Sequence, residues 1–142
     1  MKLSGIFYGV LTAIWMTVLG WAIWPLDSPY VNLPGATVSP KIVKALGIIT
    51  ISRDFKITRD EPIFVQRTLV RGDCKQSCEI VDLPSGNLML PVGIYKGMTR
   101  DQILPITVEP GNWVARFSIQ WRDRLGRSRT EPMEELSFTV VP

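Results

Sequence analysis

Residues 6–24 carry no charged side chain, and this apolar stretch constrains the chain more than any other feature. As an α-helix that rises about 1.5 Å per residue, the stretch would extend roughly 28 Å, close to the roughly 30 Å hydrocarbon core of a bilayer. The sequence therefore predicts a transmembrane helix within residues 1–24.

The same stretch has two interpretations, a cleaved signal peptide or a retained signal anchor. Lys2 would supply the charged start of a signal peptide, and Gly20-Trp21-Ala22 fits a small-x-small cleavage site. The length of the stretch favours the anchor, as do Trp21 and Trp24, which suit the membrane–water interface. Since Lys2 precedes the helix and an acidic residue is the first charge after it, the positive-inside rule predicts a cytoplasmic N-terminus. The remainder would then be extracytoplasmic, or periplasmic.

Small side chains recur at every fourth position of the apolar stretch and would form one ridge along a helix. Such a ridge lets two helices approach closely, so it predicts a helix-mediated oligomer or packing against a membrane partner. The alternative is the ordinary composition of a membrane helix. The ridge consists of Gly5, Gly9, Ala13 and Thr17.

Residues 25–46 contain four prolines and are expected to form an extended tether. Proline at this density blocks regular helix and favours extended backbone. Residues 38–43 would join the edge of the following domain, which is expected to span residues 47–142.

From residue 47 onward the hydrophobic pattern is that of β-strands. Apolar and polar side chains alternate through residues 112–122 and again through residues 136–140, which predicts strands with one buried and one exposed face. About seven short strands separated by turns favour an antiparallel β-sandwich. The other expected strands are residues 48–52, 55–58, 63–71, 79–83, 88–90 and 103–108.

Residues 103–108, followed by Pro-Gly-Asn-Trp at 110–113 and a strongly alternating strand, resemble the E–F corner of immunoglobulin-like and fibronectin III-like domains. The resemblance implies an all-β, Ig-like antiparallel sandwich behind the transmembrane helix. Cys74 and Cys78 are too close in sequence to match the usual inter-sheet disulfide of such domains. The plan of anchor, tether and sandwich also looks like that of envelope proteins from bacteria and their phages. A sandwich fold implies no function by itself.

The two cysteines are expected to form a local disulfide if the domain lies in an oxidising compartment, and to be free thiols if it is cytosolic. Cys74 and Cys78 without any histidine cannot complete a tetrahedral zinc site in one chain.

The absence of histidine also excludes Ser/His/Asp and Cys/His catalysis within the chain. Acidic residues near 54–61 and 131–135 lack calcium-loop spacing and are interpreted as solvated turn charges. No phosphate-binding glycine loop or nucleophile elbow is present in the sequence. These observations predict a protein that is not an enzyme and uses no metal or cofactor.

Five arginines within the C-terminal third form the candidate binding surface. Arginine makes bidentate bonds to phosphate and carboxylate, so the group would suit an anionic envelope component, while the alternative is a solvated sheet face. Trp113, Phe117 and Trp121 point to the opposite face, which argues against base stacking and hence against nucleic acid as a partner. The five are Arg116, Arg122, Arg124, Arg127 and Arg129.

Together these features predict a non-enzymatic single-pass membrane protein. It would present an extracytoplasmic sandwich to a protein partner or envelope component, alone or as a subunit of a larger membrane or virion assembly. The alternative is a signal-peptide-cleaved, soluble periplasmic or secreted binding module, such as an inhibitor, chaperone or pilus-like subunit.

Overall fold

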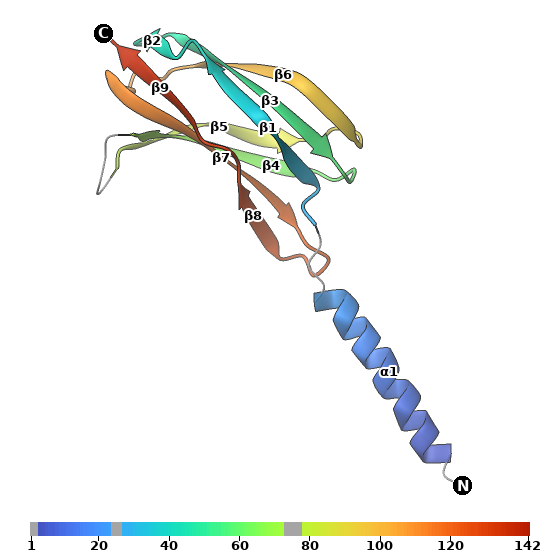
Figure 1. Ribbon diagram of the computed structural model, residues 1–142. Helices are drawn as coiled ribbons and strands as arrows, with labels where there is room; N and C mark the ends of the chain where they lie inside the picture. The colour runs from blue at the N-terminus through green and yellow to red at the C-terminus, as the bar shows by residue number, and fades with distance from the viewer. Residues whose placement is uncertain (1–2, 24–26, 73–77) are drawn as a thin grey trace. The chain divides into compact units, whose positions relative to one another are not determined.

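The computed structural model describes residues 3–23, 27–72 and 78–142, which are mostly β with one helix (Figure 1). The helix is α1 (Leu3–Ile23). Nine strands follow within the described ranges and form two sheets. One sheet has three strands in the order β1 (Tyr30–Ser39), β3 (Ile48–Ile57), β6 (Gly93–Ile103), all antiparallel.

The other sheet has six strands, and their order is β2-β9-β7-β4-β5 with β8 paired to β7. Its strands are β2 (Ile42–Lys44), β9 (Leu136–Val141), β7 (Gly111–Arg122), β4 (Ile63–Arg71), β5 (Ile80–Leu88) and β8 (Ser128–Pro132). Neighbours along β9, β7, β4 and β5 are antiparallel, whereas β2 runs parallel to β9.

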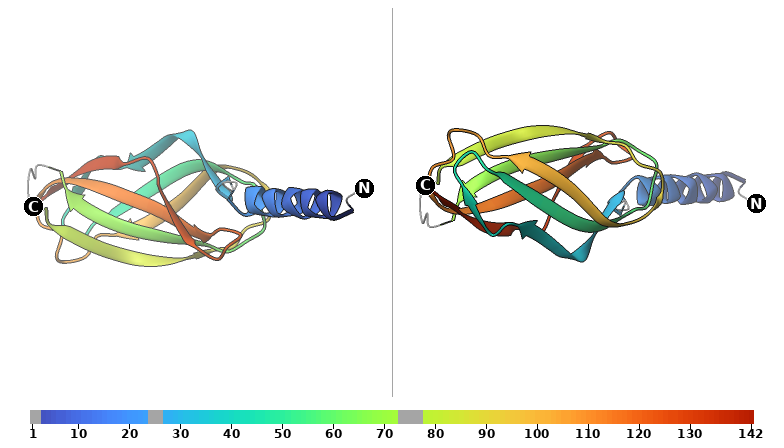
Figure 2. Two further views of the ribbon diagram at one scale, coloured as in Figure 1. Left: turned by 90° about the horizontal axis from the view of Figure 1, so that it is seen from below. Right: turned by 90° about the horizontal axis from the view of Figure 1, so that it is seen from above.

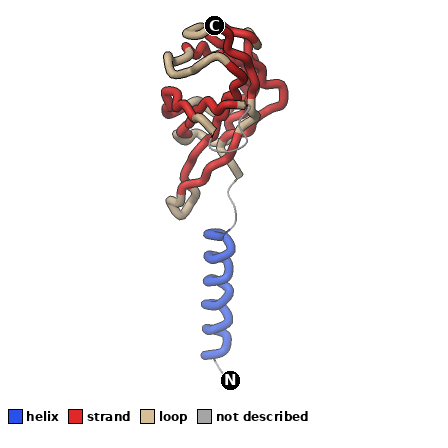
Figure 3. Tube along the Cα trace, turned by 90° about the vertical axis from the view of Figure 1, so that its left-hand side faces the viewer, coloured by secondary structure: helices blue, strands red, loops and turns tan. Residues whose placement is uncertain are grey.

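The chain divides into two compact units. Residues 1–27 and 122–128 form the first, and residues 28–121 and 129–142 form the second. Strands make up most of the second unit, as the tube drawing of Figure 3 shows. Its two sheets lie in separate layers, with β3 and β6 on one side and β4, β5 and β7 on the other (Figure 2).

The core of the second unit lies between these layers because both sheets turn alternate side chains toward each other. Trp113 and Ala115 of β7 are fully buried and pack in one cluster with Ile49 and Ile51 of β3. A second cluster lies around Phe55 of β3 and is made of Tyr30, Phe55, Ile57, Ile63 and Ile119.

The first unit contains α1 and the turn between β7 and β8. Asp123 organises this turn: its side chain accepts hydrogen bonds from the backbone N–H groups of Leu125 and Arg127, both at 2.9 Å. Gly126 adopts a φ of 73°, in the left-handed region that favours glycine. The turn connects β7 to β8.

Residues 25–46, expected to be a tether, contain β1 and β2. β1 pairs with β3 and buries Tyr30 and Val38, so its chain belongs to the sheets. The prolines are accommodated because a register irregularity surrounds Pro34, and Pro40 lies between β1 and β2. Irregularities and strand ends are where a sheet tolerates the missing N–H group of proline.

The helix prediction requires a correction. Among the helices of the described chain, none combines the length and the apolar character that crossing a membrane requires. Absence of charge was the main basis of the prediction. It does not make a helix fully apolar, because α1 also contains glycines, threonines and one tyrosine.

The predicted fold class, an all-β antiparallel Ig-like sandwich behind a transmembrane helix, is therefore wrong as stated. The structure has one helix that does not meet the requirement for a membrane span, and the sheets of its described residues include the parallel pair β2–β9. Residues 103–108 were expected to form a strand leading into an Ig-like corner, but β6 ends at Ile103 and residues 104–108 follow it. They contain a turn in which the Val108 N–H donates to the Pro105 carbonyl at 3.0 Å.

Candidate functional site

A cavity of about 290 Å³ lies within the second unit, between its two sheets. Its wall is largely apolar and includes Phe55 of β3, Val65 of β4, Leu88 of β5 and Phe117 of β7. Three arginines also line it, and none of its lining residues is acidic. The arginines are Arg53, Arg67 and Arg100.

Arg53 is the most buried of the three. Every second residue from 49 to 57 of β3 faces the core, so the strand carries Arg53 inward at an apolar position, where it is 8% exposed. Its Nη2 donates to the Glu134 carbonyl at 3.0 Å, and its Cζ lies 4.4 Å from the centroid of the Phe117 ring. Nε and Nη1 are buried and have no hydrogen-bond partner among the described residues. A guanidinium stays charged in such a place, and its burial without full pairing costs free energy.

The part of the cavity around Arg53 and Tyr30, called the inner end below, has electrostatics that follow from the charge of Arg53. Burial lowers the pKa of Arg53, while Tyr30 and Glu134 act in the opposite direction. Burial raises the pKa of Tyr30 to about 12, against the opposing effect of Arg53. The Tyr30 ring stacks on Phe55 with 5.0 Å between centroids, and Phe55 stacks on Tyr95 at 5.2 Å. The inner end therefore combines a cation, a phenol that stays protonated and an aromatic surface.

The other two arginines come from opposite sheets. Arg67 lies on β4 and is half-buried, whereas Arg100 lies on the edge strand β6 and is exposed. Arg67 donates from Nη1 to the Pro84 carbonyl at 2.6 Å. Burial lowers the pKa of Arg67, and the charge of Arg100 lowers it further, so the two cations repel each other. The positive charge of the cavity thus extends from the interior to the surface.

No carboxylate of the described chain lies within ion-pair distance of Arg53, Arg67 or Arg100. Low dielectric surroundings strengthen the attraction of such cations for an anion. The apolar wall favours contact with a hydrocarbon group. The arrangement can therefore hold an anion that also has an apolar part.

None of the five arginines that the sequence predicts as a binding surface lines this cavity. Residues 48–52 and 55–58 were expected to be separate strands, which placed Arg53 in a loop. The structure shows one strand, β3, with a register irregularity between Arg53 and Phe55 opposite β6. The sequence does indicate that Arg53 faces inward, because position 53 falls in the same alternating series as the apolar residues at 49, 51, 55 and 57.

The five arginines of the predicted binding surface are divided between the two units. Arg116 pairs with Glu135 at 2.7 Å, and Arg127 pairs with Asp123 at 2.8 Å. Within the first unit, Arg124 lies over the Trp21 ring, 4.5 Å from its centroid. Arg122 and Arg129 are exposed. The structure therefore does not define the five as a single surface, and carboxylates already pair with two of them.

The remaining predicted residues are partly within the described chain. Gly5, Gly9, Ala13 and Thr17 lie on α1, where Thr17 Oγ1 donates to the Ala13 carbonyl at 2.8 Å and the space beside Gly9 is open. Trp21 is 58% exposed. Cys78 is disulfide-bonded. Cys74, the other cysteine of the sequence, and Trp24 lie outside the described residues.

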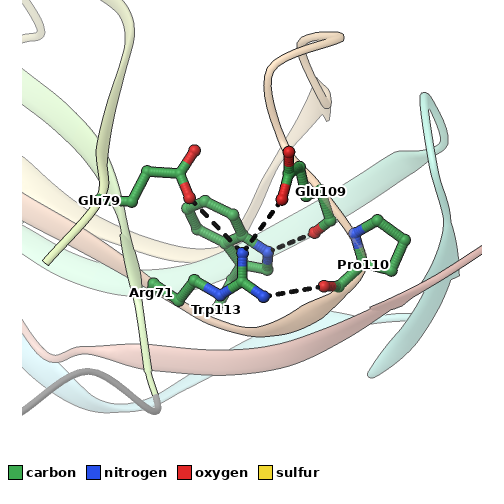
Figure 4. A network of polar contacts seen from close by, with 5 residues as sticks. All are labelled: Arg71, Glu79, Glu109, Pro110 and Trp113. Carbon is green, nitrogen blue, oxygen red and sulfur yellow. Dashed lines mark hydrogen bonds and ion pairs between the residues drawn. The ribbon is translucent and has the colours of Figure 1, made fainter.

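A second group of polar contacts surrounds Arg71 at the end of β4 (Figure 4). Its Nη1 lies 3.5 Å from Glu79 Oε2 and 3.6 Å from Glu109 Oε2, and its Nη2 donates to the Pro110 carbonyl at 3.2 Å. Trp113 Nε1 donates to the Glu109 carbonyl at 2.8 Å. Every polar partner in this group comes from the chain itself, so the network is structural.

Glycine at position 111 is required by this network. Gly111 has a φ of 147°, and a Cβ added there would come within 3.0 Å of Arg71 Nη2. The Pro-Gly pair that precedes Trp113 in the sequence therefore provides both the turn and the space for the guanidinium.

We expect Arg71→Met to lower the free energy of unfolding by about 1 kcal/mol, since it removes one hydrogen bond to a carbonyl and two partly exposed ion pairs. Urea unfolding monitored by circular dichroism measures the change. Arg122→Met, at an exposed end of β7, is the matched control and should change stability by much less. Equal effects of the two substitutions would show that the network contributes nothing beyond surface charge.

Comparison with known proteins gave no matching family model and no matching curated protein. Among solved structures, the chain is similar to the Pseudomonas fluorescens alkylpurine DNA glycosylase AlkC bound to DNA containing an abasic site analog, with a TM-score of 0.51 and 16% identity. The match covers 89% of this chain and 33% of the glycosylase, so the chain spans about a third of that protein. At this identity the likeness concerns the fold alone.

The putative ApaA protein from Bordetella pertussis also matches, with a TM-score of 0.43 and 15% identity. That match covers 78% of this chain and 93% of the other chain. The similarity is too low to support an argument about this protein.

These findings correct the function and location predicted from the sequence. A single-pass protein with a cytoplasmic N-terminus and an extracytoplasmic Ig-like sandwich is wrong, as is the membrane as a partner. The described chain has no helix suited to span a membrane, and the fold is shared with a DNA glycosylase.

The prediction against nucleic acid as a partner also requires a correction. It depended on which face of one strand the aromatic side chains occupy. The similar solved structure has DNA bound, and the prediction against nucleic acid is not kept.

Proposed function

We propose that this chain is a non-catalytic binding domain that holds a small organic anion in the cavity between its sheets. The observation that carries the proposal is a set of three arginines, unaccompanied by any acidic residue, in a cavity whose wall is largely apolar. A bound anion would offset the free energy spent on keeping Arg53 buried with incomplete pairing.

The size of the cavity limits the ligand. Its volume of about 290 Å³ lies at the lower end of the range for small-molecule pockets. With roughly 30 Å³ per water-sized group, it has room for on the order of ten non-hydrogen atoms. An eight-carbon fatty carboxylate, which has one charged end and a flexible tail, is therefore a suitable probe.

The chemistry of the lining supports binding without catalysis. The residues that line the cavity include no histidine, cysteine, lysine, aspartate or glutamate. Tyr30, with a pKa of about 12, is poorly suited to give or take a proton near neutral pH.

Calorimetric titration of the full chain with octanoate tests the proposal, with 1-octanol as the uncharged probe of equal length. We expect saturable binding of octanoate and at least tenfold weaker binding of octanol. Arg53→Met should weaken octanoate binding at least tenfold, which corresponds to about 1.4 kcal/mol. Arg122→Met removes one arginine outside the cavity and should leave the affinity unchanged.

Absence of octanoate binding, or equal affinity for octanoate and octanol, would overturn the proposal. A single-stranded DNA oligonucleotide is the third probe, because the similar solved structure has DNA bound. If the oligonucleotide binds, octanoate does not, and Arg53→Met has no effect, the chain acts through a different surface and the cavity is not its binding site.

A further inference from the structure

We propose that the charged end of the ligand is the dianion of a phosphate monoester, held at the opening of the cavity between Arg67 and Arg100. This inference rests on the proposed function and specifies the class of ligand. Arg67 on β4 and Arg100 on β6 line the same cavity from opposite sheets, so a group placed between them would contact both layers.

The accessible cations are at the opening. Nε and Nη1 of Arg53 are buried from solvent, so Arg53 would act on a ligand in the cavity through its charge rather than by direct hydrogen bonds from these atoms. Arg67 is half-buried and uses Nη1 for the Pro84 carbonyl, which leaves most of its N–H groups available. The side chain of Arg100 is exposed and makes no hydrogen bond or ion pair with the described residues. The headgroup would therefore bind at the opening, with the apolar stem extending inward.

Charge balance favours a dianion over a carboxylate. Arg67 and Arg100 are close enough for the charge of one to affect the pKa of the other, and Arg53 adds a third positive charge further inside. One carboxylate would leave most of this repulsion in place. A phosphate monoester carries about −1.5 to −2 at neutral pH and has three oxygens that accept bonds from arginine.

The inner wall suits a flexible aliphatic stem. Met98 and Met133 both line the cavity together with Leu88 and Phe117. Methionine side chains adapt to irregular shapes because they are unbranched and have several rotatable bonds. The class of ligand is therefore a phosphate monoester with an aliphatic stem of limited length.

The test compares octyl phosphate, octanoate and inorganic phosphate by calorimetry on the full chain. At about pH 8 we expect octyl phosphate to bind at least tenfold more tightly than octanoate, and inorganic phosphate to bind much more weakly than octyl phosphate. The advantage should shrink at about pH 5.5, because the second pKa of a phosphate monoester is about 6. Octanoate binding should change little over this range, because a carboxylate with a pKa near about 4 to 5 is already mostly ionised.

The protein contributes little to this pH dependence. Besides Arg67 and Arg100, the charged or titratable groups that line the cavity are Arg53 of β3 and Tyr30 of β1, and Glu134 acts on the charge of Arg53. Arginine stays charged, and Tyr30 with a pKa of about 12 stays protonated over the range tested.

Variants locate the headgroup. Arg100→Gln and Arg67→Gln should each reduce the affinity for octyl phosphate about tenfold and weaken octanoate binding less, whereas the control Arg122→Gln should change neither. Equal affinities for octyl phosphate and octanoate at about pH 8, or no loss in Arg100→Gln, would overturn the phosphate assignment and leave the anion-binding function intact. If neither amphiphile binds, the proposed function itself fails.

Discussion

Trp113→Ala is expected to lower the free energy of unfolding by about 3–5 kcal/mol, the usual range for truncating a buried tryptophan. Trp113 of β7 is 0% exposed, and its Nε1 donates to the Glu109 carbonyl at 2.8 Å. Its ring also faces the Arg71 guanidinium, with 5.8 Å from Cζ to the centroid. The substitution therefore leaves a cavity in the main core cluster and removes a support of the Arg71 network.

Urea unfolding followed by far-ultraviolet circular dichroism measures this loss. Trp121→Ala is the matched control, since Trp121 lies on the same strand but is only half-buried, and its Nε1 has no hydrogen-bond partner among the described residues. We expect the control to lose less than half as much stability. A larger loss for Trp121 than for Trp113 would mean that the principal core lies around the second cluster.

Arg53→Met is expected to have the opposite effect on the protein without ligand and to raise the free energy of unfolding by about 1–2 kcal/mol. The substitution removes a buried guanidinium with two unpartnered nitrogens, and such groups cost about 1–3 kcal/mol. Losses of the Glu134 hydrogen bond and of the contact with Phe117 offset part of the gain. Methionine fills a similar volume beside Met133, which also lines the cavity.

Differential scanning calorimetry of both proteins measures the gain. It should be nearly constant with pH around neutrality, because arginine does not lose its charge there. Combined with loss of octanoate binding, a more stable variant would show that Arg53 is kept for function at the expense of stability. A loss of stability greater than about 1 kcal/mol would instead make Arg53 a structural anchor whose bond to Glu134 outweighs its burial.

Strands whose two faces differ in exposure could be predicted from the sequence. β7 matches the expected strand because Trp113, Ala115, Phe117 and Ile119 alternate with polar residues and this face lies against the other sheet. The bounds of β4 coincide with the expected residues 63–71 for a similar reason, since it is a central strand between β5 and β7.

Pairing between distant strands could not be predicted in the same way. β1 carries a proline and a glycine, Pro34 and Gly35, so its local composition resembles a linker, and only its register with β3 makes it a strand. The parallel pair β2–β9 joins residues 42–44 to residues 139–141, and no local pattern indicates that partnership.

The cavity depends on the same long-range pairing. Arg53, Arg67 and Arg100 are far apart in sequence and converge only because β3, β4 and β6 are placed in facing sheets. In contrast, the predicted arginines were chosen for proximity in sequence, and Arg116 and Arg127 of that group already pair with carboxylates. Clustering of arginines in the sequence therefore indicated the candidate site less well than one arginine at a strand position that faces the core.

The connections between strands have a kinetic consequence. Residues 40–41 lead from β1 in one sheet to β2 in the other, and residues 89–92 lead from β5 to β6 in the same way. Residues 45–47, 58–62 and 104–110 also cross between the sheets, so five short links restrain their separation, and we expect the cavity to exist before any ligand arrives. Binding of a ligand to the cavity would then need little rearrangement of the backbone. Ligands of equal charge would associate at similar rates, so differences in their affinity would come from their dissociation rates.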